Sequence, residues 1–124
     1  MLRPEDNELL CRVGPGTPGG KLLRSYWQPI ATIEEMPVGG HPMPIKILSE
    51  DLVLFRNTDG KLGLMERFCA HRRSSLEIGR AEKNGIRCAY HGWLYGMDGQ
   101  CLEMPAEEPN CPLIKEVKLK AYKV

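Results

Sequence analysis

The stretch CAYHGWLYGMDGQC, residues 88–101, places a Cys-x-x-His pair next to a signal for a tight β-turn. Asp98-Gly99 separates two short strand-like runs at 93–95 and 100–103. Asp-Gly between such runs is typical of a β-hairpin, because both residues tolerate the left-handed backbone of a two-residue turn. The same dipeptide recurs at residues 59–60, just before another apolar run. The chain is therefore expected to build antiparallel hairpins with metal-binding residue types beside their strands.

The rest of the chain extends this antiparallel pattern. Thirteen Gly and ten Pro favour many turns and few long helices. A short helix is expected over Pro4–Val13, followed by a glycine-rich loop at Gly14–Gly20. Strands are expected within Leu22–Ile33 and at Ile45–Leu48, Leu52–Arg56, Leu62–Met65 and Val117–Val124. The predicted fold class is all-β: a small antiparallel β sandwich or barrel with two ligand-bearing hairpin loops and a short N-terminal helix.

The length of the chain sets its domain organisation. With 124 residues the chain has room for one hydrophobic core and not for two. We expect a single domain over residues 1–124, with 22–124 as its core and 1–21 as an N-terminal helix and glycine-rich loop. Because the strand-like run 117–124 ends before a partner strand returns, we also expect that a catalytic domain is absent here and follows in a longer protein.

Composition and charge exclude several classes of protein. The net charge is +1 and the Lys and Arg residues are scattered, so no surface for nucleic acid is expected. No run approaches about 18 consecutive apolar residues, and no basic-then-apolar leader opens the chain, so neither a membrane span nor a signal peptide is expected. Five cysteines is an odd number for a disulfide framework. These features favour a cytoplasmic location, where cysteines stay free or bind metal.

Two compact pairs carry the chemistry: Cys69-Ala-His71 and Cys88-Ala-Tyr-His91, with sixteen residues between them. A Rieske-type [2Fe–2S] cluster takes two Cys ligands on one iron and two His ligands on the other. Each pair here can supply one ligand to each iron. Zinc accepts the same four ligands, but zinc loops more often pair like ligands, as in Cys-x-x-Cys. The mixed pairs favour the iron–sulfur cluster, with a zinc-binding structural module as the remote alternative.

The residues around these pairs resemble the Rieske proteins, and more narrowly the Rieske oxygenases of the phthalate dioxygenase type. CAYHGWLYGMDGQC is similar to the family's Cys-x-x-His-Gly-Trp segment, and CAHRRSSLEIGR to its Cys-Pro-His-Arg-Gly-x-Ser-Leu pattern. The similarity extends to YWQPIA at 26–31 and to EMPAEEP at 103–109, which resembles the loop that covers the cluster. Two positions depart from the pattern, since Ala70 replaces Pro and Arg73 replaces Gly. Because Gly often supplies a special backbone shape, the loop path at Arg73 stays open.

The resemblance implies one-electron transfer through a cluster bound by Cys69, His71, Cys88 and His91, as the electron-input domain of an aromatic ring-hydroxylating dioxygenase in aromatic hydrocarbon catabolism. It further implies a flavin and iron–sulfur reductase or a ferredoxin as electron donor, a mononuclear iron oxygenase domain as acceptor, and a homotrimer for a full-length protein. That iron needs two His and a carboxylate, whereas only His41 remains of three His. These residues alone are therefore not expected to be catalytically complete. The alternative function is a stand-alone Rieske ferredoxin component of an oxygenase system.

The resemblance also bears on the redox potential. Rieske proteins of the cytochrome bc type carry an extra Cys in each ligand loop and a Ser that donates a hydrogen bond to a sulfide, where this chain has Ser74, Tyr90 and Trp93. Fewer hydrogen bonds to the cluster sulfurs lower the potential. We expect a value in the lower part of the Rieske range of about −150 to +300 mV, with Tyr95 as a remaining donor.

Other reactive or aromatic residues receive plainer interpretations. Cys11, Cys101 and Cys111 lack metal-like spacing and are expected to be free or core thiols. His41 lies in a Gly/Pro-rich turn and is expected at the surface. Trp27 is expected in ordinary core packing, and Trp93 is expected to shield the cluster.

Overall fold

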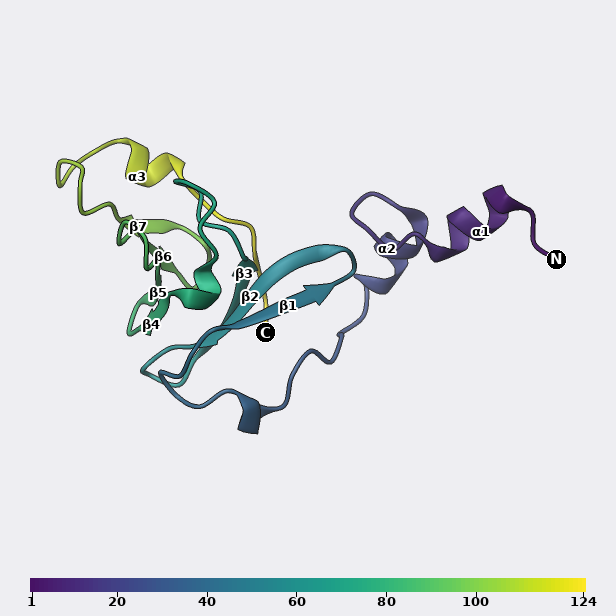
Figure 1. Cartoon of the computed structure of the whole chain (residues 1–124), viewed down its shortest axis with the longest axis horizontal. Coiled ribbons are helices and arrows are strands. Elements are labelled where there is room, and N and C mark those ends of the chain that lie inside the picture. Colours follow the sequence, from purple (N-terminus) through teal and green to yellow (C-terminus); the bar gives the residue numbers. More distant parts are fainter.

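A computed structural model describes all of residues 1–124. The strands are β1 Met43–Ile47, β2 Glu50–Arg56, β3 Leu62–Glu66, β4 Arg80–Glu82, β5 Gly85–Arg87, β6 Leu94–Gly96, β7 Cys101–Glu103 and β8 Ala121–Tyr122. The helices are α1 Pro4–Cys11, α2 Pro18–Leu23 and α3 Leu113–Glu116, with 3₁₀ turns η1 Ile33–Glu35 and η2 Leu76–Ile78. The strands form two antiparallel sheets of order β1-β2-β3-β8 and β4-β5-β6-β7 (Figure 1). The expected all-β antiparallel fold is confirmed.

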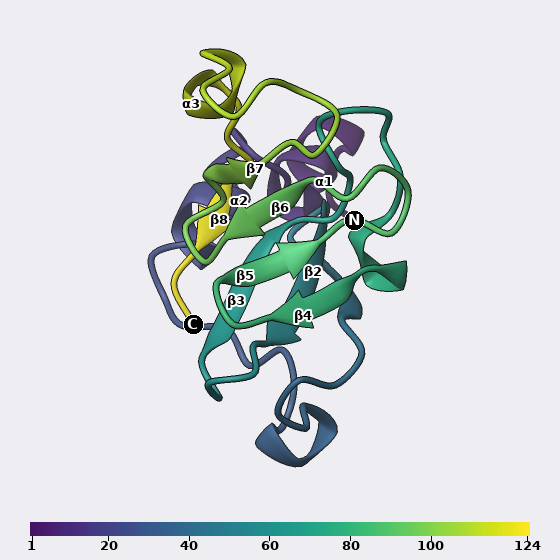
Figure 2. The ribbon, with the colours of Figure 1, turned by 90° about the vertical axis from the view of Figure 1, so that its left-hand side faces the viewer.

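The main core joins the two sheets, and Figure 2 shows the β4–β7 sheet in front of β2 and β3. In β2 successive side chains point to opposite faces. Val53 and Phe55 therefore enter the core shared with the second sheet, whereas Leu52 and Leu54 enter a smaller cluster on the outer face. Burial on both faces explains why β2 reads as a continuous apolar run.

The N-terminal helices lie to one side of the sheets (Figure 1). In α1, Pro4 occupies the first turn together with two acidic residues, which suits the helix dipole, and no residue is buried. The Thr17 hydroxyl accepts a hydrogen bond from the Gly20 N–H and starts α2 inside the expected glycine-rich loop. The expectation of a loop therefore holds only for the first part of Gly14–Gly20. None of the helices has the length and apolar character of a membrane span.

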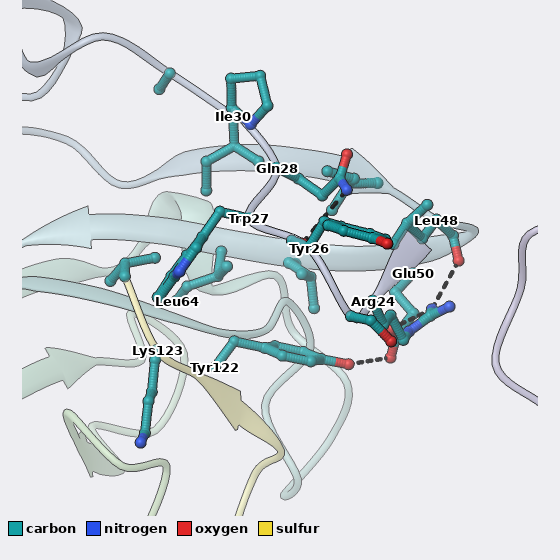
Figure 3. A pocket seen from close by; sticks show the side chains of 16 residues that line it. Arg24, Tyr26, Trp27, Gln28, Ile30, Leu48, Glu50, Leu64, Tyr122 and Lys123 are labelled. Carbon is teal, nitrogen blue, oxygen red and sulfur yellow. Dashed lines mark hydrogen bonds and ion pairs between the residues drawn. The ribbon is translucent and has the colours of Figure 1, made fainter. Parts of the chain in front are cut away.

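The strand expected within Leu22–Ile33 does not form. After α2 this segment runs outside the sheets without regular structure up to η1. The expectation that Trp27 packs in the core is also wrong, since Trp27 is 80% exposed. Its ring and that of Tyr122 line an open groove of about 490 Å³ (Figure 3). Because the segment lies outside the sheets, Trp27 lines this groove, whereas Ile30 packs against the smaller cluster on the outer face of β2.

The C-terminal strand is shorter than expected and has a partner. Of Val117–Val124 only β8 is a strand, and it pairs with β3 through Leu64↔Tyr122 and Met65↔Ala121. Just before it, Lys118 forms an isolated bridge with Gln100, in the turn between β6 and β7 of the second sheet. The segment thus links the two sheets, and the expectation of an unpaired final strand is wrong.

Glu50 ties the N-terminal segment to β2 and β8. Its carboxylate accepts hydrogen bonds from Arg24, Lys120 and Tyr122, each at 2.6 Å; Figure 3 shows those from Arg24 and Tyr122. Burial alone would raise the carboxyl pKa, but these donors hold the pKa of Glu50 at about 2, below its ordinary 4.5. Because the folded pKa is the lower one, the stabilisation is present above the unfolded pKa and is lost as the pH falls toward 2.

We expect Glu50→Gln to remove a measurable part of the acid sensitivity of the fold, with Glu82 as the other carboxyl whose pKa falls to about 2. In the wild type Glu50 contributes at most about 3 kcal/mol that disappears between roughly pH 5 and pH 2. Urea unfolding at a series of pH values measures the free energy of unfolding in both proteins. Glu116→Gln serves as the control, because Glu116 is exposed and forms no ion pair. Equal pH dependence in wild type and Glu50→Gln would contradict the assignment.

Candidate metal centre

The first Cys-His loop, residues 69–74, follows β3. The Cys69 N–H donates to the Ser74 carbonyl at 2.9 Å, and the Arg73 N–H donates back to the Cys69 carbonyl at 2.9 Å. These two bonds close a compact turn around the Cys-x-His pair. Arg73 has φ of 58°, in the left-handed region.

The second Cys-His loop, residues 88–93, joins β5 to β6 and repeats this design. The Cys88 N–H donates to the Trp93 carbonyl at 2.9 Å, and the Gly92 N–H donates to the Cys88 carbonyl at 3.1 Å. Gly92, with φ of 75°, is thus the counterpart of Arg73. The path of the first loop, which the sequence left open at Arg73, follows the glycine-type turn of the second.

The fold pairs like residues although the sequence pairs unlike ones. Cys69 and Cys88 are 1% and 3% exposed, belong to the same core cluster, and lie close enough for Cys88 to raise the pKa of the Cys69 thiol. His71 and His91 are exposed, and their ring centroids are 4.5 Å apart at an interplanar angle of 63°. The structure therefore brings all four sequence-predicted residues together as a buried Cys pair and an exposed His pair.

Aromatic rings hold the His pair in place. Trp93, which is largely buried, stacks on His71 with centroids 4.7 Å apart and planes 5° from parallel. On the other side Tyr90 lies against His91 at 3.8 Å between centroids. These contacts restrict how the two imidazoles rotate, so that both rings are oriented to bind the same metal ion.

Tyr95 directs its hydroxyl at the Cys pair. Its Oη accepts a hydrogen bond from the Ala70 N–H at 3.1 Å and lies 3.2 Å from the Cys69 Sγ. Since the oxygen already accepts from Ala70, its own hydrogen is free to point at the sulfur. Burial raises the pKa of Tyr95 well above 10, which keeps this proton on the phenol.

The pKa shifts of His91 and Cys69 are consistent with a metal site. Partial desolvation lowers the pKa of His91, and the neighbouring His71 and Arg72 act in the same direction. This favours the neutral imidazole, the form that binds metal. Burial raises the pKa of Cys69, against the hydrogen bond from Tyr95. A bound cation would supply the positive charge that makes the thiolate stable there.

The donor set fits a centre of two metal ions. No three His, Cys, Asp or Glu side chains converge in a way that could hold a single ion. A tetrahedral zinc site uses four ligands around one point, whereas a Rieske cluster takes two protein ligands at each of two irons. The buried sulfur pair and the exposed nitrogen pair correspond to these two halves.

The remaining sequence-predicted residues lie outside this arrangement. His41 is exposed, as expected. Cys11 is exposed, Cys101 buried and Cys111 half-buried, and all three are free thiols, which confirms their interpretation.

Sequence reasoning missed the part of the site built by Arg87. This residue on β5 donates to the Gly92 carbonyl at 2.7 Å and pairs with Glu82 at 2.8 Å and Glu103 at 2.7 Å. Its hydrogen bond is the main reason that the pKa of Glu82 falls to about 2. Arg87 thus anchors the second Cys-His loop to β4 and β7. The Asn84-Gly85 dipeptide at the start of β5 is a local hairpin signal. It could have predicted the β4–β5 hairpin, and with it the strand that carries Arg87.

Comparison with known proteins agrees with this geometry. Residues 26–123 match the family described as the Rieske [2Fe-2S] domain. The chain is 45% identical over 124 residues to the phthalate 4,5-dioxygenase oxygenase subunit of Pseudomonas putida, covering 99% of this chain and 28% of that protein. It is 44% identical over 127 residues to the 5,5′-dehydrodivanillate O-demethylase oxygenase subunit of a Sphingobium species, covering 100% of this chain and 30% of that protein.

Solved structures with the same fold extend the comparison. Pseudomonas putida CBB5 NdmA superposes with a TM-score of 0.73 at 33% identity, covering 83% of this chain and 32% of NdmA. Dicamba monooxygenase bound to dicamba gives 0.72 at 27% identity, covering 82% of this chain and 29% of that protein. The chain thus spans under a third of the length of these relatives. Because the family match covers most of its residues, the chain belongs to the Rieske [2Fe–2S] domain family.

Proposed function

We propose that Cys69 and Cys88 hold one iron of the Rieske cluster and that His71 and His91 hold the other. One observation carries this assignment: two loops that each mix Cys and His fold so that the Cys residues meet in the core and the His residues meet at the surface. When bound, the cluster supplies a reversible one-electron couple.

The residues around this site have different roles. The buried Cys side keeps water from the sulfurs, and Tyr95 donates a hydrogen bond to one of them. The exposed His rings present the accessible edge through which a partner protein can exchange electrons. Trp93 and Tyr90 hold these rings, and Arg87 holds the loop that carries His91.

We place this domain, residues 1–124, at the electron-input end of an aromatic ring-hydroxylating oxygenase subunit. The high identity to oxygenase subunits over the whole chain supports this setting. A flavin and iron–sulfur reductase or a ferredoxin would then donate the electron. The acceptor would be a mononuclear iron in an oxygenase domain of a neighbouring subunit, in a homotrimer. Cys11, Cys101 and Cys111 stay free thiols beside the two proposed ligands, which supports a reducing compartment, the cytoplasm.

An anaerobic redox titration of the iron–sulfur-loaded chain tests the electron-transfer role. We expect one electron per chain and a midpoint in the lower part of the range of about −150 to +300 mV. His71→Cys and His91→Cys should each lower the midpoint sharply, because a thiolate replaces a neutral imidazole. A midpoint that neither substitution moves would contradict the His ligands.

Tyr95→Phe is expected to lower the midpoint potential by about 50 mV, since a hydrogen bond to a charged sulfur stabilises the reduced form more. The visible spectrum during the titration provides the measurement. Tyr122→Phe is the matched control, because its hydroxyl binds Glu50 away from the Cys-His loops. Equal midpoints in wild type and Tyr95→Phe would show that this hydroxyl does not act on the bound sulfur.

The reading frame beyond the codon for Val124 separates the oxygenase setting from a stand-alone ferredoxin. A following domain with two His and a downstream Asp or Glu supports the oxygenase setting. A stop codon directly after Val124 in the native gene favours the ferredoxin.

A further inference from the structure

The two Cys-His loops differ in how the carbonyl of their turn residue is held. In both loops the turn residue, Arg73 or Gly92, donates its N–H to the carbonyl of the cysteine that opens the loop. The Gly92 carbonyl in turn accepts a hydrogen bond from Nη1 of Arg87 at 2.7 Å. The Arg73 carbonyl accepts no hydrogen bond. A side chain therefore holds the turn of the second loop only.

The Arg87 side chain spans both expected ligands of the second loop. Arg87 directly precedes Cys88 in the chain, and its guanidinium reaches Gly92, which directly follows His91. The backbone closes the loop at its base, where Arg87 pairs with Leu94 across β5 and β6. Cys88 and His91 therefore lie in a loop that the β5–β6 pairing closes at its base and the Arg87 side chain closes at its turn.

Two carboxylates fix the direction of the Arg87 guanidinium. Glu82 accepts hydrogen bonds from its Nε at 2.8 Å and from its Nη2 at 3.0 Å, and Glu103 accepts one from Nη2 at 2.7 Å. A planar guanidinium bound along one edge by a carboxylate has a fixed orientation, and here its Nη1 points at the Gly92 carbonyl. The Arg87 side chain is 21% exposed. Arg87 is therefore a rigid connection between β4, β7 and the second loop.

The segment that follows β7 packs against the same glycine. A Cβ at Gly92 would lie 3.2 Å from the Cγ of Pro105, which is closer than most such contacts. Between Glu103 and Pro105, the Met104 side chain is buried in the core cluster that contains the Cys pair. Gly92 is therefore fixed on two sides, by the hydrogen bond from Arg87 and by the Pro105 ring.

The charge of Arg87 is offset by its neighbours, so its specific contribution is geometric. Glu82 and Glu103 carry two negative charges, and Arg80 also pairs with Glu82 at 2.6 Å. The charges of these two arginines and two glutamates sum to zero. A group without net charge exerts only a weak field at a distance. What distinguishes Arg87 from Arg80 is the hydrogen bond to the Gly92 carbonyl.

We propose that Arg87 is a positioning residue for His91, and that it acts through the Gly92 carbonyl. The proposal rests on the proposed function, because the placement of His91 matters only if this imidazole binds iron. The peptide bond between His91 and Gly92 joins the imidazole-bearing residue directly to the held turn, so a displaced Gly92 carbonyl turns the backbone at His91. His71 lies in the other loop, whose turn carbonyl no side chain holds. Loss of the Arg87 side chain therefore affects one histidine of the pair and not the other.

Pulsed electron paramagnetic resonance on the reduced, iron–sulfur-loaded chain with ¹⁵N-labelled histidine tests this role. In Arg87→Gln one of the two ¹⁵N couplings should change, and it should be the coupling that is absent from His91→Cys. Release of iron to a chelator should be about ten-fold faster than in the wild type, since residues that orient metal ligands typically contribute at least this much to metal affinity. Two unchanged couplings would overturn the positioning role, as would an equal change in both.

Glu82→Gln is the matched control. It breaks the same ion pair from the other side and leaves Arg87 bonded to Gly92 and Glu103. A merely structural role of the ion pair would lower Tm in both variants, whereas only Arg87→Gln should change the His91 coupling. If Glu82→Gln changed that coupling as much as Arg87→Gln, the hydrogen bond to Gly92 would not carry the effect and the proposal would be overturned.

Arg87→Lys provides the same test if Arg87→Gln does not fold. Lysine keeps the positive charge but lacks the planar fork that binds Gly92, Glu82 and Glu103 together, so the His91 coupling should again change, and unchanged couplings would overturn the proposal. The wild type separates the two levels of the account. Absence of any ¹⁵N coupling in the wild type overturns the proposed function, whereas two wild-type couplings that the Arg87 variants leave unchanged overturn the positioning role alone.

Discussion

The Cys88→Ala chain is expected to purify colourless and without bound iron or acid-labile sulfide. Cys88 is one of only two thiolates available to its iron, and it sits 3% exposed beside Cys69. The third buried cysteine, Cys101, lies outside both Cys-His loops and donates its S–H to the Glu103 carbonyl at 3.6 Å. Iron and sulfide assays should fall from about two of each per chain to near zero.

Cys101→Ala is the control for this loss. Cys101 is 1% exposed, so its substitution removes the same atoms from the same core. This variant should keep its iron, sulfide and visible absorption. If Cys101→Ala lost the iron while Cys88→Ala retained it, the assignment of the thiolate ligands would be wrong.

The second large effect is expected for Gly99→Ala, which should lose about 4 kcal/mol of stability or fail to fold. Gly99 has φ of 82° in the β6–β7 turn. A Cβ at this position would lie 2.0 Å from the Leu119 carbonyl oxygen, which is backbone and cannot move aside alone. The C-terminal segment that links the two sheets would have to shift.

Gly16→Ala measures the backbone-strain part of this effect alone, without a steric contact. Gly16 has almost the same φ, 83°, but a Cβ there would meet nothing within 4 Å. It should cost only about 1 kcal/mol, the strain of the left-handed backbone. Denaturant unfolding of both variants gives the comparison. Similar losses in the two proteins would show that backbone strain, and not the contact with Leu119, dominates.

The parts of the fold that could be predicted are those with local signals. Asp98-Gly99 marks the β6–β7 turn, and Asp59-Gly60 lies in the β2–β3 turn, because turn chemistry acts over a few residues. The pairing of β8 with β3 joins segments that are far apart in the chain, so no local sequence pattern predicts it. The exposed position of Trp27 cannot be predicted in this way, because an apolar side chain does not reveal whether its segment lies inside or outside the sheets.

The candidate site likewise has a part that the sequence predicts and a part that only the fold shows. Sequence spacing identifies the four residues, but only the fold shows Cys69 beside Cys88 and His71 beside His91. The left-handed conformation of Arg73 likewise depends on loop hydrogen bonds that the sequence does not display. Spacing therefore names the residues, whereas the three-dimensional pairing decides which kind of centre they suit.

Pulsed electron paramagnetic resonance on the reduced, iron–sulfur-loaded chain, labelled with ¹⁵N only at histidine, tests the central claim most directly. Ligation by His71 and His91 predicts strong coupling of the unpaired electron to two ¹⁵N nuclei. Each coupling should disappear singly in His71→Cys and His91→Cys. A cluster signal without ¹⁵N coupling, or a colourless protein holding zinc in place of iron, would contradict it.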